Sequence, residues 1–183
     1  MLEMFKTKLQ RFLDPKDILA SSGIQQGETV ADFGCGNGFY PLAAAQMVGE
    51  NGMVYAIDVK PEALEATVSA ARHQGLNNIY TIRHDLEKPG VAIRDNSCDA
   101  VILAGILHLS KLQRSILKET YRVLKSGGKI IVIEWKKERL AFGPNINDRL
   151  SETQATDLLA KAGFRFQSEM PADAFHYALI FSK

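Results

Sequence analysis

Short apolar segments separated by helix-like segments restrict the folds open to this chain more than any other feature of its sequence. The segment Asp-Ala-Val-Ile-Leu-Ala at 99–104 is apolar at consecutive positions, which is typical of a strand buried on both faces. Strands of this kind with helices between them indicate a parallel sheet covered on both sides. Five segments are expected to be strands: 28–33, 53–58, 79–83, 99–104 and 129–135.

Helix-like segments with ordinary start and stop signals lie between and after these strands. Pro61 suits the first turn of a helix, and Ser126-Gly127-Gly128 is typical of a helix stop. Ser151-Glu-Thr-Gln154 resembles a capping box, which marks the start of a helix. The expected helices cover 40–48, 61–75, 111–125 and 151–161.

Two further segments, 164–170 and 175–181, are expected to close the chain as strands. Only 171–174 separate them, which is too short for a crossover helix, so these two strands are expected to pair antiparallel. A length of 183 residues suits one domain. We therefore predict a single domain over 1–183 with a three-layer, doubly wound α/β fold, whose sheet has seven mostly parallel strands and an antiparallel last strand.

Composition argues against several other classes of protein. The formal net charge is +1, so charge does not indicate a nucleic-acid partner. Cys35 and Cys98 are too few for a disulfide framework, and no secretory signal peptide is recognisable, which together favour a cytoplasmic protein. No apolar run reaches the length of a transmembrane helix.

The stretch Val-Ala-Asp-Phe-Gly-Cys-Gly-Asn-Gly-Phe at 30–39 places three glycines directly after the first strand. A phosphate-binding P-loop would need a lysine followed by serine or threonine, and neither is present here. A dinucleotide fingerprint would place its third glycine one residue later than Gly38. Asp32 would also lie badly beside a pyrophosphate, whereas its carboxylate suits a ligand with an ammonium and a sulfonium group.

Asp58 ends the second strand, where an acidic side chain can bind both hydroxyls of a ribose. This feature is shared by dinucleotide and nucleoside sites, so Asp58 does not separate the two. A nicotinamide-dependent oxidoreductase therefore stays open as an alternative at this point.

Five motifs in order resemble those of the class I S-adenosylmethionine-dependent methyltransferases. The resemblance is to the small single-domain type related to the ubiquinone/menaquinone-biosynthesis (methyltransferase type 11) group, and it extends from about residue 14 to 183. The motifs are Asp32-Phe-Gly-Cys-Gly-Asn-Gly38, Ala56-Ile-Asp58, His84-Asp-Leu86, Cys98-Asp-Ala-Val-Ile102 and the run from Leu117 to Gly128. The fold implied by the resemblance is the Rossmann-like methyltransferase fold.

The resemblance also implies roles in binding S-adenosylmethionine, whose product is S-adenosylhomocysteine. The glycine turn would approach the methionine part, the region of Asp32 would meet its ammonium group, and Asp58 would accept from the ribose. Val59 would pack on adenine, with Asp85 accepting from its amino group. The full implied binding set is Asp32, Gly34, Cys35, Gly36, Gly38, Asp58, Val59, Asp85, Leu86, Ala104 and Gly105, the last two lining the methyl-donor cavity.

His108 and His176 are the candidates for a catalytic base. His108 follows the fourth strand and His176 begins the last one, and imidazole exchanges protons near neutral pH. The alternative for each is a hydrogen-bonded structural histidine. No cluster of histidine, cysteine and carboxylate side chains has the spacing of metal ligands, so we expect no metal.

Two segments are candidates for the walls of the acceptor site. The irregular segment 136–150, preceded by Trp135 and containing Phe142 and Asn145, is expected to form one wall, with a solvated connection as the alternative. Residues 1–22 are expected to form a helical cap over the cofactor. Within them, 1–13 have an apolar face (Leu2, Phe5, Leu9 and Phe12) that alternatively suits peripheral contact with a membrane.

The sequence thus predicts an S-adenosylmethionine-dependent methyltransferase that acts by in-line displacement on a small-molecule acceptor. A non-catalytic S-adenosylmethionine-binding partner subunit is a second hypothesis, and the nicotinamide-dependent oxidoreductase is a third. The identity of the acceptor and the oligomeric state do not follow from the sequence.

Overall fold

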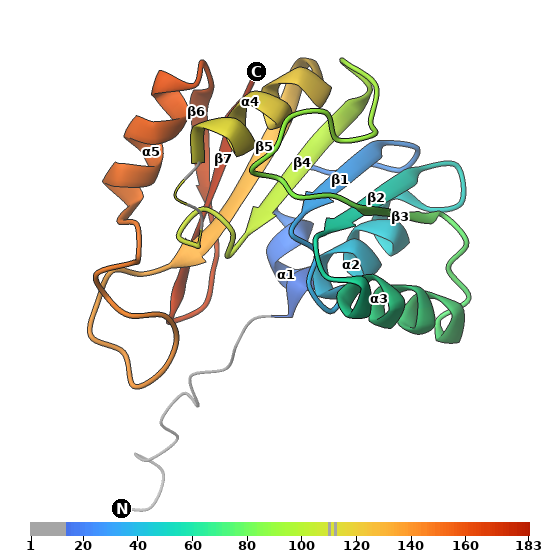
Figure 1. Ribbon diagram of the computed structural model, residues 1–183, viewed down its shortest axis with the longest axis horizontal. Helices are drawn as coiled ribbons and strands as arrows, with labels where there is room; N and C mark the ends of the chain where they lie inside the picture. Colours follow the sequence, from blue (N-terminus) through green and yellow to red (C-terminus); the bar gives the residue numbers. More distant parts are fainter. Residues whose placement is uncertain (1–13, 110, 112) are drawn as a thin grey trace, which may run out of the picture.

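The computed structural model describes residues 14–109, 111 and 113–183. Within these residues, seven strands form one sheet in the order β3-β2-β1-β4-β5-β7-β6 (Figure 1). The strands are β1 (Thr29–Phe33), β2 (Met53–Asp58), β3 (Ile79–Arg83), β4 (Cys98–Ala104), β5 (Leu124–Trp135), β6 (Arg165–Met170) and β7 (His176–Ser182). The helices are α1 (Pro15–Ala20), α2 (Phe39–Val48), α3 (Pro61–His73), α4 (Gln113–Val123) and α5 (Glu152–Lys161).

The sheet is mostly parallel. The pairs β1–β2, β2–β3, β1–β4 and β4–β5 are parallel, whereas β7 runs antiparallel to both β5 and β6. The predicted α/β fold and its reversed last strand are confirmed. The prediction of a helix from residue 1 falls mostly on 1–13, which lie outside the described residues.

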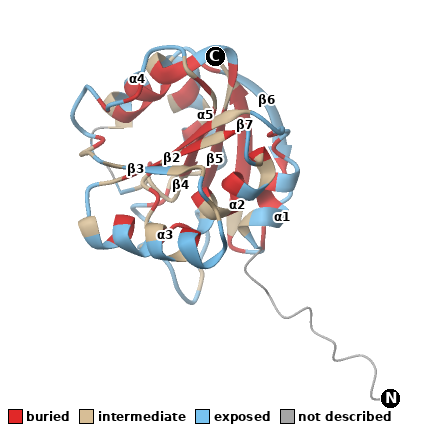
Figure 2. Cartoon of the chain, turned by 90° about the vertical axis from the view of Figure 1, so that its right-hand side faces the viewer, coloured by how far each residue is buried: buried red, intermediate tan, exposed pale blue. Residues whose placement is uncertain are grey.

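Two apolar cores, one on each face of the sheet, make the fold three-layered. On one face, α1 and α2 pack against Val30, Val54 and Ile102, and α3 packs on the same side through Leu64. On the other face, α4 and α5 pack against residues such as Phe33. Figure 2 shows the buried residues concentrated in the strands and on the inward sides of the helices. No helix in the described part of the chain is long and apolar enough to span a membrane.

The helix before the fifth strand ends earlier than predicted. The predicted helix 111–125 is α4, which stops at Val123, and β5 begins at Leu124, which pairs with Cys98. Gly127 and Gly128 therefore do not stop a helix. They lie within β5, where Gly127 has a φ of +75°, and they hydrogen-bond with the backbone of Lys183. A side chain at Gly128 would come within 2.9 Å of the Lys125 carbonyl oxygen, so the glycine serves close backbone packing.

The strand order determines where a ligand can bind. From β1 the chain proceeds to β2 and β3 on one side, and then crosses to β4 and β5 on the other. The order therefore reverses between β1 and β4, and the loops that leave these strands diverge and open a crevice at their carboxyl ends. The residues that follow β1, β2, β3 and β4 meet at this edge.

Candidate ligand-binding and catalytic site

The glycine turn after β1 needs glycine at two positions for space as well as for conformation. Gly34 and Gly38 have φ values of +85° and +87°, in the left-handed region that favours glycine. A Cβ atom on Gly34 would lie 2.8 Å from the Cδ1 atom of Ile106, and one on Gly38 would lie 2.7 Å from the Oγ1 atom of Thr67. Around Gly36, in contrast, a Cβ atom would meet nothing within 4 Å. The turn is packed at its ends and open in the middle.

Asp58 ties the end of β2 to this turn. Its Oδ2 atom accepts from the Gly36 N–H at 2.9 Å, and its Oδ1 atom accepts from the Lys60 N–H at 2.9 Å. Lys60 is the N-cap residue of α3, so Asp58 also serves the start of that helix. Each carboxylate oxygen can accept two hydrogen bonds, which leaves capacity for a pair of ligand hydroxyls.

A cavity of about 200 Å³ lies beside Asp58. This volume is below the roughly 300–1,000 Å³ of sites that enclose a whole drug-sized ligand, so it suits one part of a ligand, such as a heterocyclic base. Four predicted site residues besides Asp58 line the cavity, namely Gly34, Val59, Asp85 and Leu86. The remaining lining residues are His84, Glu87, Ile106, Leu109 and Ile116.

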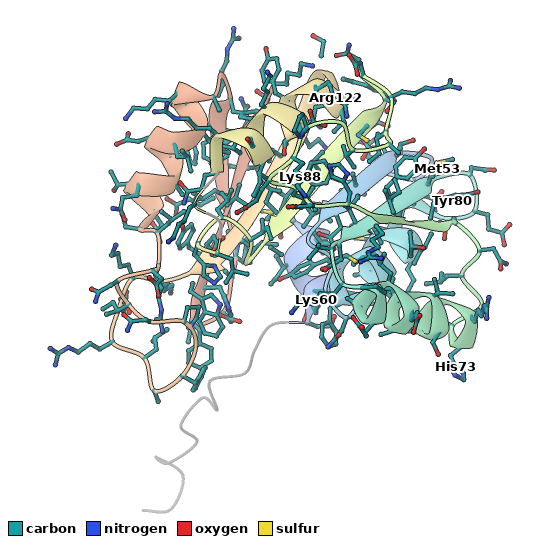
Figure 3. All side chains as sticks on the ribbon, in the orientation of Figure 1. Met53, Lys60, His73, Tyr80, Lys88 and Arg122 are labelled. Atoms are coloured by element: carbon teal, nitrogen blue, oxygen red, sulfur yellow. The ribbon has the colours of Figure 1, made fainter. Side chains whose placement is uncertain are left out.

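The loop after β3 holds Asp85 at the rim of the cavity. Its carboxylate accepts from the Glu87 N–H at 3.1 Å and pairs with the Lys88 ammonium at 3.3 Å. These contacts lower the pKa of Asp85, the hydrogen bond from Glu87 first and that from Lys88 second. The His84 Nε2 atom lies 3.0 Å from the Lys88 carbonyl oxygen, which closes the loop. The labelled Lys88 and Lys60 locate this loop and the start of α3 in Figure 3.

Asp32, at the carboxyl end of β1, is buried without a partner. Asp32 is only 1% exposed, and neither of its carboxylate oxygens accepts a hydrogen bond from any residue that the structure describes. Burial, and secondarily the charge of Asp58, raise the pKa of Asp32 from its ordinary value to about 8. A buried carboxyl group without a partner is destabilising, and a cationic ligand group would remove that cost.

His108, on the loop after β4, is held by Glu134 at the carboxyl end of β5. The His108 Nδ1 atom lies 2.7 Å from the Glu134 Oε2 atom, and the Glu134 side chain is fully buried. Glu134 is not among the site residues predicted from the sequence. A signal was available, because Lys-Ile-Ile-Val-Ile-Glu-Trp places one carboxylate in an otherwise apolar strand where a buried charge needs a partner.

His176, the other predicted base, pairs with a different carboxylate and lies on the other face of the sheet. Its Nδ1 atom lies 2.8 and 2.9 Å from the two carboxylate oxygens of Asp173, and its ring contacts Trp135 at a tilt of 52°, with 4.2 Å between ring centroids. Glu134 and Trp135 are consecutive on β5, so their side chains point to opposite faces of the sheet. The two histidines therefore approach the sheet edge from opposite faces and do not form a pair.

The segment 136–150, which we call the acceptor-wall loop, is organised by the buried Arg149. Its guanidinium donates to four carbonyl oxygens of the loop, those of Lys136, Glu138, Phe142 and Pro144, at 2.7 to 3.1 Å. It also lies over the Trp135 ring, 5.5 Å from the centroid. Asn145, a predicted acceptor-site residue, is exposed and accepts from the Asn147 N–H within its own turn.

The remaining predicted residues lie at the same edge. Ala104 ends β4 and Gly105 follows it with φ +63°; a Cβ atom there would lie 3.8 Å from the Cε1 atom of His108. Cys35 is buried beneath the turn, and burial above all raises the pKa of its thiol to about 12. Within the described part of the chain, no three histidine, cysteine or acidic side chains come together as a metal site would require.

Comparison with known proteins identifies a family that this chain resembles. The model of a family described as a methyltransferase domain matches residues 24–170. The chain is 31% identical over 118 residues to the ubiquinone/menaquinone biosynthesis C-methyltransferase UbiE of Haemophilus ducreyi, covering 63% of this chain and 44% of that protein. It is 32% identical over 114 residues to an arsenite methyltransferase of Halobacterium salinarum, covering 62% of this chain and 28% of that one. The chain thus spans less than half the length of these two relatives.

Among solved structures, a SAM-dependent methyltransferase from Aquifex aeolicus superposes on the chain with a TM-score of 0.86. The two are 30% identical, and the match covers 97% of this chain and 93% of that one. The similarity therefore extends over the whole sheet and its helices.

Proposed function

We propose that this chain, which belongs to the class I S-adenosylmethionine-dependent methyltransferase family, binds S-adenosylmethionine at the edge of β1, β2 and β4 and transfers its methyl group to a small-molecule acceptor. Family membership confirms the predicted resemblance to the UbiE group. The activity, the acceptor, the roles of the individual site residues and a cytoplasmic location are parts of the proposal.

The observation that carries the proposal is the unpartnered carboxyl of Asp32 beside the glycine turn. S-Adenosylmethionine has an ammonium and a sulfonium group, and either positive charge would compensate a carboxylate in this position. In its ionised form, the same side chain would repel the pyrophosphate of a nicotinamide dinucleotide. Asp32 therefore favours the methyltransferase over the oxidoreductase.

The other features of the site fit the remaining parts of the ligand. Asp58 retains acceptor capacity for the ribose hydroxyls, and the 200 Å³ cavity between Val59 and Leu86 is apolar enough to hold adenine. Asp85 lies at the rim of this cavity, where it would accept from the adenine amino group. When bound, S-adenosylmethionine supplies an activated methyl group, and the chain supplies alignment, which contributes about 7–11 kcal/mol in well-oriented systems.

Arsenite, the substrate named for one relative, is disfavoured as the acceptor here. Arsenic is a thiophilic element, and thiolates are the form in which cysteine binds soft ions. The chain has two cysteines, both buried, and burial raises the pKa of Cys98 to about 11 as well as that of Cys35 to about 12. We propose instead an organic acceptor bound against the acceptor-wall loop.

Isothermal titration calorimetry of the full chain tests the proposal. S-Adenosylhomocysteine should bind with one site per chain, and NAD should not bind. Absence of S-adenosylhomocysteine binding would overturn the proposal, and preferential binding of NAD would support the oxidoreductase. A chain that binds S-adenosylhomocysteine but releases none from S-adenosylmethionine with any acceptor would match the non-catalytic subunit.

A further inference from the structure

Glu134 connects the carboxyl end of β5 to the loop after β4 through a completely buried carboxylate. Its Oε1 atom accepts from the backbone N–H groups of Leu107 and His108 at 2.8 and 3.3 Å, and its Oε2 atom lies 2.7 Å from the His108 Nδ1 atom. The carboxylate thus receives three hydrogen bonds from consecutive residues that are 26 and 27 positions away in sequence. The Glu134 side chain has an exposed fraction of 0% and that of His108 5%, so water does not compete for these contacts.

This arrangement selects one tautomer of His108. A carboxylate can only accept hydrogen bonds, so the His108 Nδ1 atom must carry the proton that faces Glu134. In a neutral imidazole the other nitrogen, Nε2, then has a free lone pair and accepts protons. No residue in the described part of the chain hydrogen-bonds to this Nε2 atom, so the structure leaves its lone pair available.

The loop that carries His108 also borders the ligand cavity. Ile106 and Leu109, on either side of His108, line the 200 Å³ cavity, and Ile106 packs against Gly34 of the glycine turn. The His108 ring lies beside Gly105, at the carboxyl end of β4. A base at this place is close to the strand end where the crevice between β1 and β4 opens.

We infer that Glu134 is a positioning residue that holds His108 as a proton acceptor, and that the methyl acceptor therefore carries a proton on its nucleophilic group, as a hydroxyl does. This inference rests on the proposed methyltransferase function and deepens it by naming the class of acceptor. It assigns the role of catalytic residue to His108 alone, since only its Nε2 atom would touch the acceptor.

A hydroxyl acceptor would take the methyl group in a single displacement. The acceptor oxygen forms a bond to the methyl carbon while the bond between sulfur and that carbon breaks, and the electron pair of the broken bond stays on sulfur. The hydroxyl proton moves to the His108 Nε2 atom, and the imidazolium so formed is stabilised by the Glu134 carboxylate. An acceptor with a lone pair and no proton to lose, such as a tertiary amine or a thioether, would not need this base.

The tautomer can be measured without any acceptor. In long-range ¹H–¹⁵N spectra of the full chain at alkaline pH, four histidines give signals, and a His108→Gln variant assigns the one of interest. The wild-type chain should show His108 protonated at Nδ1 and bare at Nε2. In Glu134→Gln, the amide oxygen would accept from the two backbone N–H groups, and the amide NH₂ would face Nδ1 as a donor. The proton should therefore move to Nε2.

Glu119 offers a matched control, because it is also a buried carboxylate that accepts two backbone N–H bonds. These come from Gly90 and Val91, and Glu119 pairs with Arg122 rather than with a histidine. Glu119→Gln should leave the His108 signals unchanged. A wild-type His108 protonated at Nε2, or an unchanged tautomer in Glu134→Gln, would overturn the inference.

Kinetics test the acceptor class. Release of S-adenosylhomocysteine is measured with phenol, catechol and hydroquinone, and in parallel with N,N-dimethylaniline and dimethyl sulfide. Turnover should occur on a hydroxyl compound, and kcat should fall about 10²- to 10⁴-fold in Glu134→Gln and His108→Gln, the range of a general base, with KM unchanged. Turnover confined to the proton-free compounds would overturn the acceptor class. Absence of S-adenosylhomocysteine binding to the wild-type chain would instead refute the proposed function. The tautomer measurement would still decide the role of Glu134 in that case.

Discussion

Replacing Asp32 with asparagine removes the one carboxyl group that is buried without a partner among the described residues. Asparagine has nearly the shape of a protonated aspartic acid but cannot ionise. The substitution therefore tests whether Asp32 is held neutral in the ligand-free fold and whether its negative charge serves the ligand.

The magnitude follows from the difference in pKa between the folded and unfolded chains. The folded pKa of Asp32 is about 8, and the ordinary value is 3.8. Between these two values the folded state binds more protons than the unfolded state, so stability falls as pH rises through this window and is lowest above it. At about 1.4 kcal/mol per pKa unit, the loss is about 6 kcal/mol over the whole window and about 3 kcal/mol between pH 5 and pH 7.

The Asp32→Asn chain lacks this loss, so it should gain stability relative to wild type as pH rises. Urea unfolding of both chains at about pH 5, 7 and 9 measures the difference, in which the titration of all other groups cancels. Glu65→Gln, on an exposed position of α3, controls for the loss of one negative charge. A difference between Asp32→Asn and wild type that stays constant with pH would refute the reasoning.

The same variant should bind the ligand more weakly. Loss of a charge-assisted contact costs about 1.5–3 kcal/mol, or roughly 10- to 150-fold in the dissociation constant of S-adenosylhomocysteine. Higher stability of the ligand-free chain combined with weaker binding is the expected pair of results. Unchanged affinity would show that Asp32 does not meet the cationic part of the ligand.

Two further predictions concern the backbone around the site. Gly38→Ala should weaken S-adenosylhomocysteine binding and destabilise the chain by about 1–3 kcal/mol, because φ is +87° and the new Cβ atom would lie 2.7 Å from the Thr67 Oγ1 atom; calorimetry and urea unfolding measure both effects. Arg149→Met should release the acceptor-wall loop, whose carbonyl oxygens lose their donor, and destabilise the chain by about 1–3 kcal/mol. Limited proteolysis should then cut within this loop while S-adenosylhomocysteine still binds, and an unchanged digestion pattern would contradict the role given to Arg149.

Much of the fold was predictable because patterns among neighbouring residues determine it. Runs of consecutive apolar residues identified the buried strands, and the capping box at Ser151 was confirmed by two hydrogen bonds with Gln154. The end of α4 was not predictable in this way. Leu124 leaves the helix because it pairs with Cys98 on a strand 26 residues earlier, and a pattern within the segment does not contain that partner.

The same distinction between local pattern and tertiary contact applies to the candidate site. By itself the sequence determined the glycine turn, whose residues need left-handed conformations and close packing, and the acidic side chains at the ends of the first two strands. Only the tertiary structure decided that Asp32 is unpartnered, that Glu134 reaches His108, and that His176 lies at the opposite face with Trp135. The physical reason is that dihedral angles and periodicity belong to neighbouring residues, whereas burial, charge compensation and a histidine's tautomer depend on residues that the order of the strands brings together.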